Sequence, residues 1–184
     1  RDARPQRRAV RVAGRGELHR ARERGIRELA CRRRVETLRP RRSCLAVPGS
    51  NPRFLEKAKG LPADQVFLDL EDACAPLAKP GARKNIVAAL NDGGWGEKIR
   101  VVRVNDWTTH WTYRDVIQVV EGAGANLDCI MLPKVQTAQQ VVALDLLLTQ
   151  IEKSMGFEVG RIGIEAQIEN ALGLINVDAI ATAS

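Results

Sequence analysis

From Ser43 onward the chain repeats one pattern five times: a short apolar run rich in β-branched residues, then an amphipathic stretch. The unit recurs roughly every thirty residues, the length of a strand, its connections and a helix. Strands joined in this way lie parallel in one sheet, because a crossover helix must return the chain to the edge where the next strand begins. The repeat therefore indicates the α/β class.

The boundaries of the expected elements follow from apolar spacing and turn residues. The expected strands are Cys44–Val47, Gln65–Leu70, Ile99–Val104, Cys129–Leu132 and Ile162–Ile168. The expected helices are a first one opened by Asn51-Pro52 and then residues 81–90, 113–121 and 137–155.

No glycine-rich phosphate loop interrupts these units, which favours a TIM (β/α)8 barrel over a dinucleotide-binding fold. A complete barrel needs about 250 residues. We therefore expect residues 41–184 to form a partial barrel domain of about five units. An open five-stranded sheet is the structural alternative.

The start of the chain differs from the rest in composition. Residues 1–42 contain sixteen Arg, no Lys and five acidic residues, so they carry +11 and leave −4 for residues 43–184. Without an apolar stripe to pack on a core, residues 1–40 are expected to be a disordered Arg-rich extension. A nucleic-acid-binding arm or a targeting peptide is the functional alternative, because clustered arginines attract phosphates. The lack of aromatic residues for base stacking in this stretch counts against nucleic acid as a partner.

Two classes of protein are disfavoured. No apolar run approaches the eighteen or so residues that span a bilayer, so we expect a cytoplasmic protein without a membrane partner. The four cysteines are widely spaced and form no C-x-x-C pair, which argues against a zinc site or a disulfide framework. Cys44 and Cys129 lie in apolar runs and are expected to be small core residues.

Three carboxylates follow the second expected strand within four residues: Asp69, Glu71 and Asp72. Loops after barrel strands build sites, and hard oxygen donors in such numbers favour Mg²⁺, bound directly or through its waters. Asp69 and Glu71 should point alike by the two-residue period, while Asp72 lies in the turn. A solvated surface turn is the alternative.

Arg103 and Glu169 stand at the ends of later strands. Arg103 alternates with Val102 and Val104, so its side chain should lie on the opposite face of the sheet from theirs. There it could hold a bound carboxylate bidentately, pair with Glu71 or Glu169, or do both. We interpret Glu169 as a metal ligand rather than a surface acid, because it directly follows a strand.

Read together, the motifs of residues 40–184 resemble the citrate lyase β-subunit and malyl-CoA lyase group of the HpcH/HpaI aldolase/citrate lyase family. The matching segments, in order, are LAVPGS from residue 45, FLEKA from 54, LDLEDA from 68, Lys79 with Ala82-Arg83, VRVN from 102, MLPKV from 131 and IENALG from 168. Thr112-Tyr113-Arg114-Asp115, after Trp111, is similar to the malyl-CoA and β-methylmalyl-CoA lyases within this group.

The resemblance implies a barrel of the phosphoenolpyruvate/pyruvate superfamily type and a magnesium-dependent carbon–carbon lyase. Such an enzyme splits a 3-hydroxyacyl-CoA, such as malyl-CoA or β-methylmalyl-CoA, into glyoxylate and acetyl-CoA or propionyl-CoA. A citryl-CoA or citramalyl-CoA lyase like the citrate lyase β-subunit is the alternative. The partners it implies are a CoA thioester and a 2-oxo acid.

The resemblance also assigns roles to individual residues. Glu169 would be a metal ligand that meets the substrate, with Glu71 and Asp72 holding metal-bound waters. Arg103 would bind the oxo-acid carboxylate and the developing oxyanion. Lys57 matches a position near the CoA phosphates, although Asn51 stands where some members carry arginine.

Further parts implied by the resemblance lie beyond Ser184. They are a second metal-ligating aspartate in a Gly-x-x-Asp segment and a catalytic acid supplied by a neighbouring subunit, so a homo-oligomer is expected at full length. On this view the chain as given binds magnesium weakly. Two other hypotheses stand beside the lyase: an inactive fragment, and a nucleic-acid-binding protein that acts through the basic arm.

Overall fold

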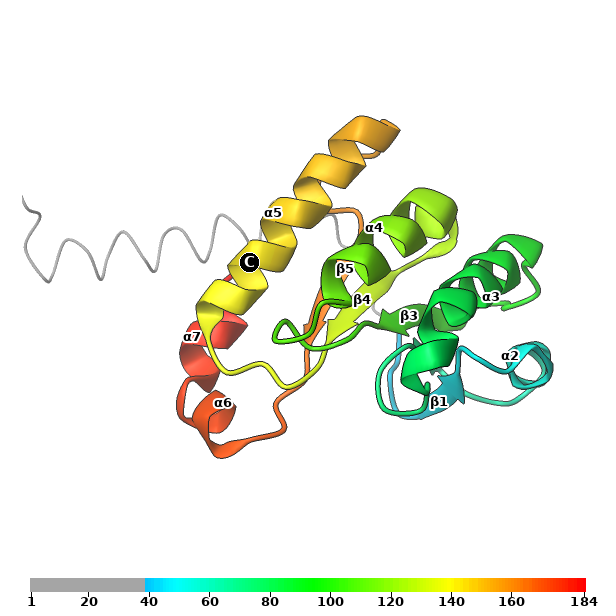
Figure 1. Cartoon of the computed structure of the whole chain (residues 1–184), viewed down its shortest axis with the longest axis horizontal. Helices are drawn as coiled ribbons and strands as arrows, with labels where there is room; N and C mark the ends of the chain where they lie inside the picture. Colours follow the sequence, from blue (N-terminus) through cyan, green and yellow to red (C-terminus); the bar gives the residue numbers. More distant parts are fainter. Residues whose placement is uncertain (1–38) are drawn as a thin grey trace, which may run out of the picture. The chain divides into compact units, whose positions relative to one another are not determined.

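The structure, a computed structural model, describes residues 39–184 (Figure 1). Their five strands form one parallel sheet in the order β1-β2-β3-β4-β5. The strands are β1 Cys44–Pro48, β2 Gln65–Asp69, β3 Ile99–Arg103, β4 Cys129–Leu132 and β5 Gly163–Ala166. Strands that follow one another in the chain are also neighbours in the sheet, as in a barrel wall and unlike a doubly wound sheet, whose order reverses.

A helix follows each strand. The helices are α2 Pro52–Lys59, α3 Lys79–Asp92, α4 Thr112–Ala123, α5 Ala138–Met155, α6 Ala171–Ile175 and α7 Val177–Ala181, with 3-10 turns η1 Pro76–Ala78 and η2 Gly124–Asn126. The cap expected at Asn51 is present, because its side chain accepts hydrogen bonds from the N–H groups of Arg53 and Phe54. All five expected strands and four expected helices are confirmed, whereas α6 and α7 were not expected.

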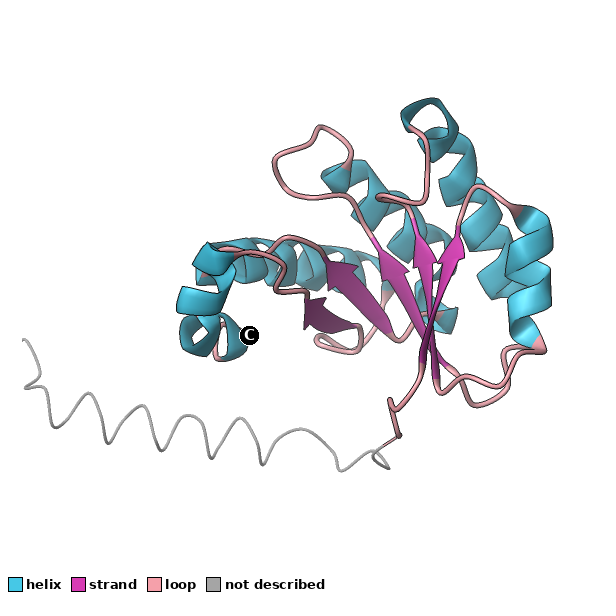
Figure 2. Ribbon diagram, turned by 90° about the horizontal axis from the view of Figure 1, so that it is seen from below, coloured by secondary structure: helices cyan, strands magenta, loops and turns pink. Residues whose placement is uncertain are grey.

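The two faces of the sheet bury different side chains. On the outer face, strand residues such as Leu68, Val102 and Ile130 join the main core with residues from α2 to α5. Figure 2 shows these helices arranged along the outside of the strands. On the inner face, Ile99, Val101, Cys129 and Met131 form a smaller cluster, with Phe67 packed against it. This alternation is the two-residue period read from the sequence.

The inner face is curved. Gln65 of β2 donates a hydrogen bond from Nε2 to Oε2 of Glu165 in β5, at 2.9 Å. The two strands are not neighbours in the sheet, because β3 and β4 lie between them. Their side chains can meet only because the sheet bends as a barrel wall does.

Three arginines attach the start of the described chain to the loops and strands of the sheet. Arg39 pairs with Asp128 at 2.7 Å, Arg42 pairs with Asp64 at 2.8 Å, and Arg41 pairs with Glu165. Hydrogen bonds from Arg42 lower the pKa of Asp64 to about 2. Residues 1–38, which hold nearly all of the expected Arg-rich extension, lie outside the described residues, so that expectation stays a prediction.

Two further expectations can be compared with the described residues. Cys129 is buried as expected, but Cys44 is exposed, so its assignment to the core was wrong. Cys44 lies on β1, which is an edge strand of the sheet in the described residues. Within residues 39–184, no helix is both long enough and apolar enough to cross a membrane.

Candidate functional site

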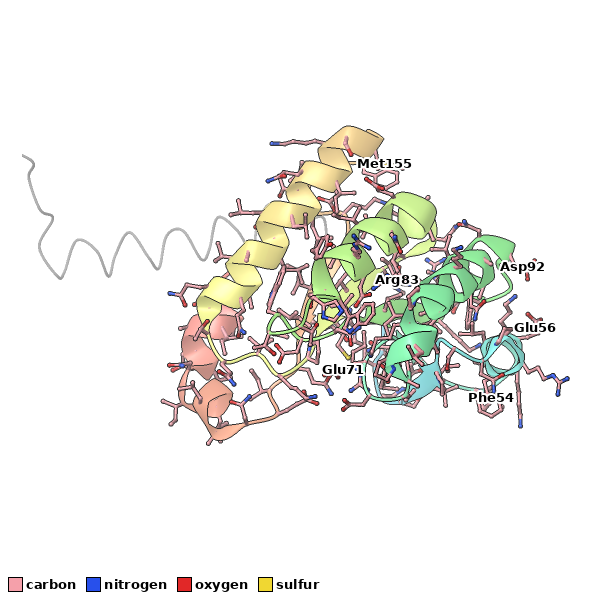
Figure 3. All side chains as sticks on the ribbon, in the orientation of Figure 1. Phe54, Glu56, Glu71, Arg83, Asp92 and Met155 are labelled. Atoms are coloured by element: carbon pink, nitrogen blue, oxygen red, sulfur yellow. The ribbon has the colours of Figure 1, made fainter. Side chains whose placement is uncertain are left out.

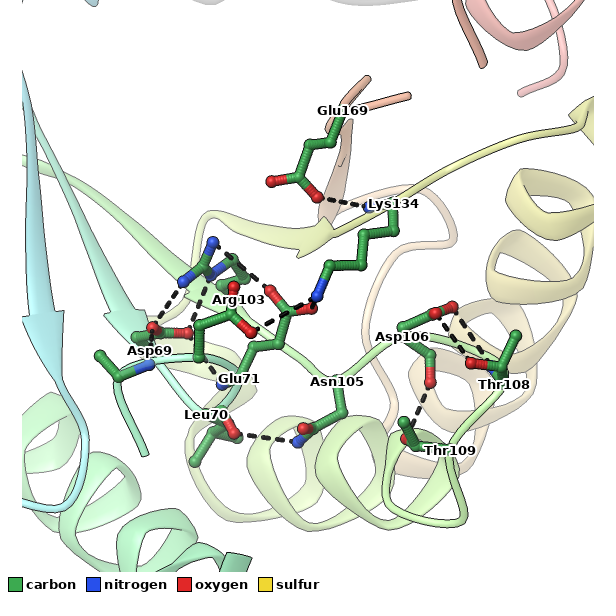
Figure 4. A network of polar contacts seen from close by, with 12 residues as sticks. Asp69, Leu70, Glu71, Arg103, Asn105, Asp106, Thr108, Thr109, Lys134 and Glu169 are labelled. Carbon is green, nitrogen blue, oxygen red and sulfur yellow. Dashed lines mark hydrogen bonds and ion pairs between the residues drawn. The ribbon is translucent and has the colours of Figure 1, made fainter. Parts of the chain in front are cut away.

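A network of charged side chains lies where β2, β3, β4 and β5 end (Figure 4). Arg103, the last residue of β3, donates from Nε to Asp69 Oδ1 at 2.8 Å and from Nη2 to Oδ2 at 2.6 Å. Asp69 also accepts hydrogen bonds from the N–H groups of Glu71 and Ala73, at 2.8 and 2.9 Å. Burial opposes the charge of Asp69, but these bonds prevail and lower its pKa below the ordinary value. Asp69 thus fixes both the guanidinium and the turn after β2.

Glu71 is a buried carboxylate with little hydrogen bonding. Its side chain is 6% exposed, and its oxygens lie 2.8 Å from Lys134 Nζ and 3.4 Å from Arg103 Nη1. Apart from these two ion-pair contacts, neither oxygen has a hydrogen-bond partner among the described residues. Burial raises the pKa of Glu71, and the charges of Lys134 and Arg103 only reduce that rise. Because an unsatisfied buried carboxylate is unfavourable, these oxygens suit an additional donor.

Lys134 links the remaining carboxylates. It lies just after β4, and its N–H donates to Glu169 Oε2 at 2.8 Å. Its Nζ pairs with Glu71 at 2.8 Å and with Asp72 at 3.4 Å. Within residues 39–184 it is also the sole non-glycine residue with a positive φ, 53°. Sequence reasoning noted Lys134 within its MLPKV segment but gave it no role.

A buried lysine from α3 holds the backbone beneath the network. Lys79 Nζ donates to the carbonyl oxygens of Leu70 and Glu71, at 2.6 and 2.8 Å, and to Asn105 Oδ1 at 2.7 Å. Asn105 in turn donates from Nδ2 to the Leu70 carbonyl at 3.0 Å. These bonds tie the turn that carries Glu71 to the loop after β3.

A buried ion pair supports this arrangement from the helix layer. Arg83, labelled on α3 in Figure 3, donates to Asp115 of α4 at 2.6 Å, and both side chains are almost fully buried. The other oxygen of Asp115 accepts from the backbone N–H and the side-chain amide of Asn105, at 3.0 and 2.6 Å. The outer helices therefore help to fix the loop between the end of β3 and α4.

Four of the five site residues predicted from the sequence come together here: Arg103, Glu71, Asp72 and Glu169. Arg103 contacts Glu71, one of the two partners suggested for it, but its main partner is Asp69. Glu169 bonds to Lys134 instead of Arg103. Lys57 is apart from the network, because it lies exposed in the last turn of α2.

The network partly fits a divalent cation. Its oxygens are the hard donors that Mg²⁺ prefers, and the unsatisfied oxygens of Glu71 could accept hydrogen bonds from cation-bound water. However, no three His, Cys, Asp or Glu side chains within residues 39–184 converge closely enough to enclose an ion. The carboxylates of the described residues therefore do not enclose an ion by themselves, and further ligands would have to complete a coordination shell.

The model of the HpcH/HpaI aldolase/citrate lyase family matches residues 42–184. L-malyl-CoA/beta-methylmalyl-CoA lyase from Cereibacter sphaeroides (strain ATCC 17025 / ATH 2.4.3) is 46% identical over 146 residues, which are 79% of this chain and 46% of that protein. Citrate lyase subunit beta from Leuconostoc mesenteroides subsp. cremoris is 39% identical over 146 residues, 79% of this chain and 47% of that protein. The chain thus spans about half the length of the curated relatives it matches.

A solved structure has the same fold. Protein CitE from Mycobacterium tuberculosis, in complex with magnesium, acetoacetate and coenzyme A, matches with a TM-score of 0.58 and 28% identity. The match covers 79% of this chain and 47% of that one. It confirms the α/β fold, with five parallel strands that alternate with helices as in part of a TIM barrel.

Proposed function

The chain belongs to the HpcH/HpaI aldolase/citrate lyase family, and from this membership we propose that the protein is a magnesium-dependent carbon–carbon lyase of CoA esters. The proposed substrate is malyl-CoA or β-methylmalyl-CoA, split into glyoxylate and acetyl-CoA or propionyl-CoA. The observation that carries the proposal is Arg103, held in one orientation beside two carboxylates, Asp69 and Glu71, at the end of the strands.

One edge of the Arg103 guanidinium is bound to Asp69, because Nε and Nη2 donate to it. The other edge, formed by Nη1 and the second N–H of Nη2, makes no hydrogen bond, and its Nη1 lies 3.4 Å from Glu71. That edge can donate two parallel hydrogen bonds to the carboxylate of a 2-oxo acid. Because Asp69 already fixes the guanidinium, little reorganisation is needed when charge develops on the substrate.

In the proposed reaction the bond between the hydroxyl-bearing carbon and the α-carbon of the CoA ester breaks. A base takes the hydroxyl proton, the oxygen becomes the aldehyde oxygen of glyoxylate, and the bonding electrons pass to the α-carbon to form the enolate of the thioester. Return of a proton to that carbon gives acetyl-CoA or propionyl-CoA. Arg103 neutralises the carboxylate next to the reacting carbon. A bound Mg²⁺ would supply Lewis-acid stabilisation of the alkoxide. Glu169 would hold that ion, and Glu71 and Asp72 would orient its waters.

The alternative substrates are citryl-CoA and citramalyl-CoA. The identity of 46% with the malyl-CoA/β-methylmalyl-CoA lyase, against 39% with citrate lyase subunit beta, supports the malyl-CoA reading. Lys57 remains proposed for the CoA phosphates on resemblance alone.

The test compares two arginines of the same strand. In the full-length protein, Arg103→Lys should lose most glyoxylate release from malyl-CoA in the presence of Mg²⁺, because an ammonium cannot replace a bidentate guanidinium. Arg100→Lys is the matched control, since Arg100 lies at the other end of β3 and pairs with Asp128 at 2.9 Å. Near-normal turnover in Arg103→Lys would remove Arg103 from the substrate site. Failure of the unaltered full-length protein to cleave malyl-CoA, β-methylmalyl-CoA, citryl-CoA or citramalyl-CoA would refute the proposed function.

A further inference from the structure

Lys134 makes two separate kinds of contact with the carboxylates of the site. Its backbone N–H holds Glu169 at 2.8 Å, and its ammonium reaches Glu71 at 2.8 Å and Asp72 at 3.4 Å. Figure 4 shows the side chain extending from Glu169 towards Glu71. One residue therefore touches every side chain to which a magnesium-related role is proposed.

The conformation of Lys134 makes this double contact possible. Its φ of 53° lies in the left-handed region, which a non-glycine residue adopts at some cost. The following Val135 donates its N–H to the carbonyl of Gln167, at 3.1 Å, so the loop after β4 is tied to the segment after β5. The backbone contact with Glu169 is thus a feature of the loop and does not depend on the side chain.

The two cations beside Glu71 differ in mobility. Arg103 is anchored by Asp69 through two hydrogen bonds, and its side chain is 11% exposed. Lys134 is 43% exposed, and apart from its ion pair with Glu71 its ammonium makes one long hydrogen bond, to Asp72 at 3.4 Å, from the end of a flexible stem. Of the two, Lys134 is the cation that can withdraw without breaking a buried network.

From this geometry we propose that Lys134 is a positioning residue: its N–H fixes Glu169, and its ammonium competes with a divalent cation for Glu71 and Asp72. The inference rests on the proposed function, because that function assigns the cation. An ammonium close to these oxygens occupies the space of cation-bound waters and repels a doubly charged ion. Divalent-cation affinity is then lower than the carboxylates alone would give, and Lys134 must swing out when the ion binds.

The test measures Mn²⁺ binding by electron paramagnetic resonance, since Mn²⁺ accepts the same carboxylate and water ligands as Mg²⁺. Lys134→Met removes the ammonium and keeps the length of the stem. Lys134→Gly also removes it, keeps the N–H and relaxes the positive φ. Both should bind Mn²⁺ at least about tenfold more tightly than the unaltered chain. Glu169→Gln should weaken binding.

Lys153→Met is the control with the same change of charge. Lys153 lies in the last turn of α5, at the end of the unit opposite to the loop that carries Lys134, and it is exposed. Its Mn²⁺ affinity should equal that of the unaltered chain. The Tm of each variant without metal reports whether it has folded. If Lys134→Met does not fold, the Mn²⁺ affinity of Lys134→Gly is the test.

Unchanged or weaker Mn²⁺ affinity in the folded Lys134 variants overturns the inference, as does undetectable binding in every variant at millimolar Mn²⁺. The outcome is separable from that of the lyase assay. If the Lys134 variants bind Mn²⁺ more tightly but no CoA ester is cleaved, the competition between Lys134 and the cation is supported and the proposed function is refuted. If a CoA ester is cleaved but all variants bind Mn²⁺ equally, the proposed function is supported and the competition is refuted.

Discussion

At the scale of single residues, the site combines two neighbouring carboxylates in opposite electrostatic situations. Asp69 accepts hydrogen bonds from Arg103 and from two backbone N–H groups, whereas Glu71 is buried without a hydrogen-bond partner. The same cation, Arg103, lies beside both. Hydrogen bonds outweigh burial and lower the pKa of Asp69, whereas burial raises the pKa of Glu71.

We predict that the two side chains titrate on opposite sides of their ordinary values. The pKa of Asp69 should lie below 3.8 and the pKa of Glu71 above 4.5, as measured by carboxyl ¹³C NMR. Asp69 then contributes stability that is complete above pH 3.8 and is lost as the pH falls through its lower folded value. Glu71 acts in the opposite sense, since its contribution declines as the pH rises from 4.5 through its raised folded value. Titration of both groups in the same direction would contradict this account.

Removing the charge of Asp69 tests the anchoring of Arg103. Asp69→Asn leaves a mostly buried guanidinium without its carboxylate, so we expect a loss of about 3–5 kcal/mol in the free energy of unfolding. Urea denaturation measures it. Asp64→Asn is the control and should change stability much less, because its partner Arg42 is 80% exposed and does not become a buried unpaired charge. Equal losses in the two variants would show that Arg103 does not depend on Asp69.

At the scale of elements, α6 is positioned by direct backbone contact with the loop that carries Lys134. A Cβ built on Gly173 would lie 2.2 Å from the carbonyl oxygen of Val135, a distance at which the backbone itself must move. Asn170, the N-cap of α6, also accepts from the N–H of Gly173 at 2.9 Å. The contact between α6 and the loop after β4 is therefore tight. Glu169 immediately precedes Asn170, the N-cap of α6.

We predict that Gly173→Ala separates α6 from this loop and so disturbs the bond between Lys134 and Glu169. The Tm should fall, and Mn²⁺ affinity should fall with it. Gly81→Ala in α3 is the matched control, because nothing lies within 4 Å of its added Cβ and alanine favours a helix. Its Tm should stay the same or rise. A Gly173→Ala variant as stable as Gly81→Ala, with normal Mn²⁺ binding, would refute the tight contact.

The sequence predicted the repeated elements well because their pattern is set by the chain itself. The two-residue period placed Arg103 opposite Val102 and Val104, and the last two residues join the outer core. The short helices α6 and α7 have too few residues for a helical period to be visible. The left-handed Lys134 and the Lys79 contacts to the backbone were not predictable, since they depend on loops from different strands meeting in space.

At the scale of the whole described unit, residues 39–42 attach the chain to widely separated parts of the sheet. Their arginines reach Asp64 before β2, Asp128 before β4 and Glu165 within β5. Arg39, one of the arginines that the sequence suggested for a nucleic-acid-binding arm, is therefore paired with Asp128 of the domain. These residues belong to the folded unit by their contacts.

We predict that a chain beginning at Ser43 has a lower Tm at pH 7 than one beginning at Arg39. The pKa of Asp64 is about 2, so its pair with Arg42 contributes fully above pH 3.8 and is lost as the pH falls through about 2. The difference in Tm should therefore shrink on acidification. Equal Tm values at pH 7, measured by circular dichroism, would show that the three pairs contribute nothing.

The hydrogen bond between Gln65 and Glu165 has a consequence for the exchange of strand-helix units between proteins of this fold. The four strands from β2 to β5 bend far enough for side chains of the first and the last to meet, and the twist between neighbouring strands contributes to this curvature. We expect curvature distributed in this way to survive the exchange of individual units. A foreign strand-helix unit grafted beside β5 would meet an edge that is already bent to receive it.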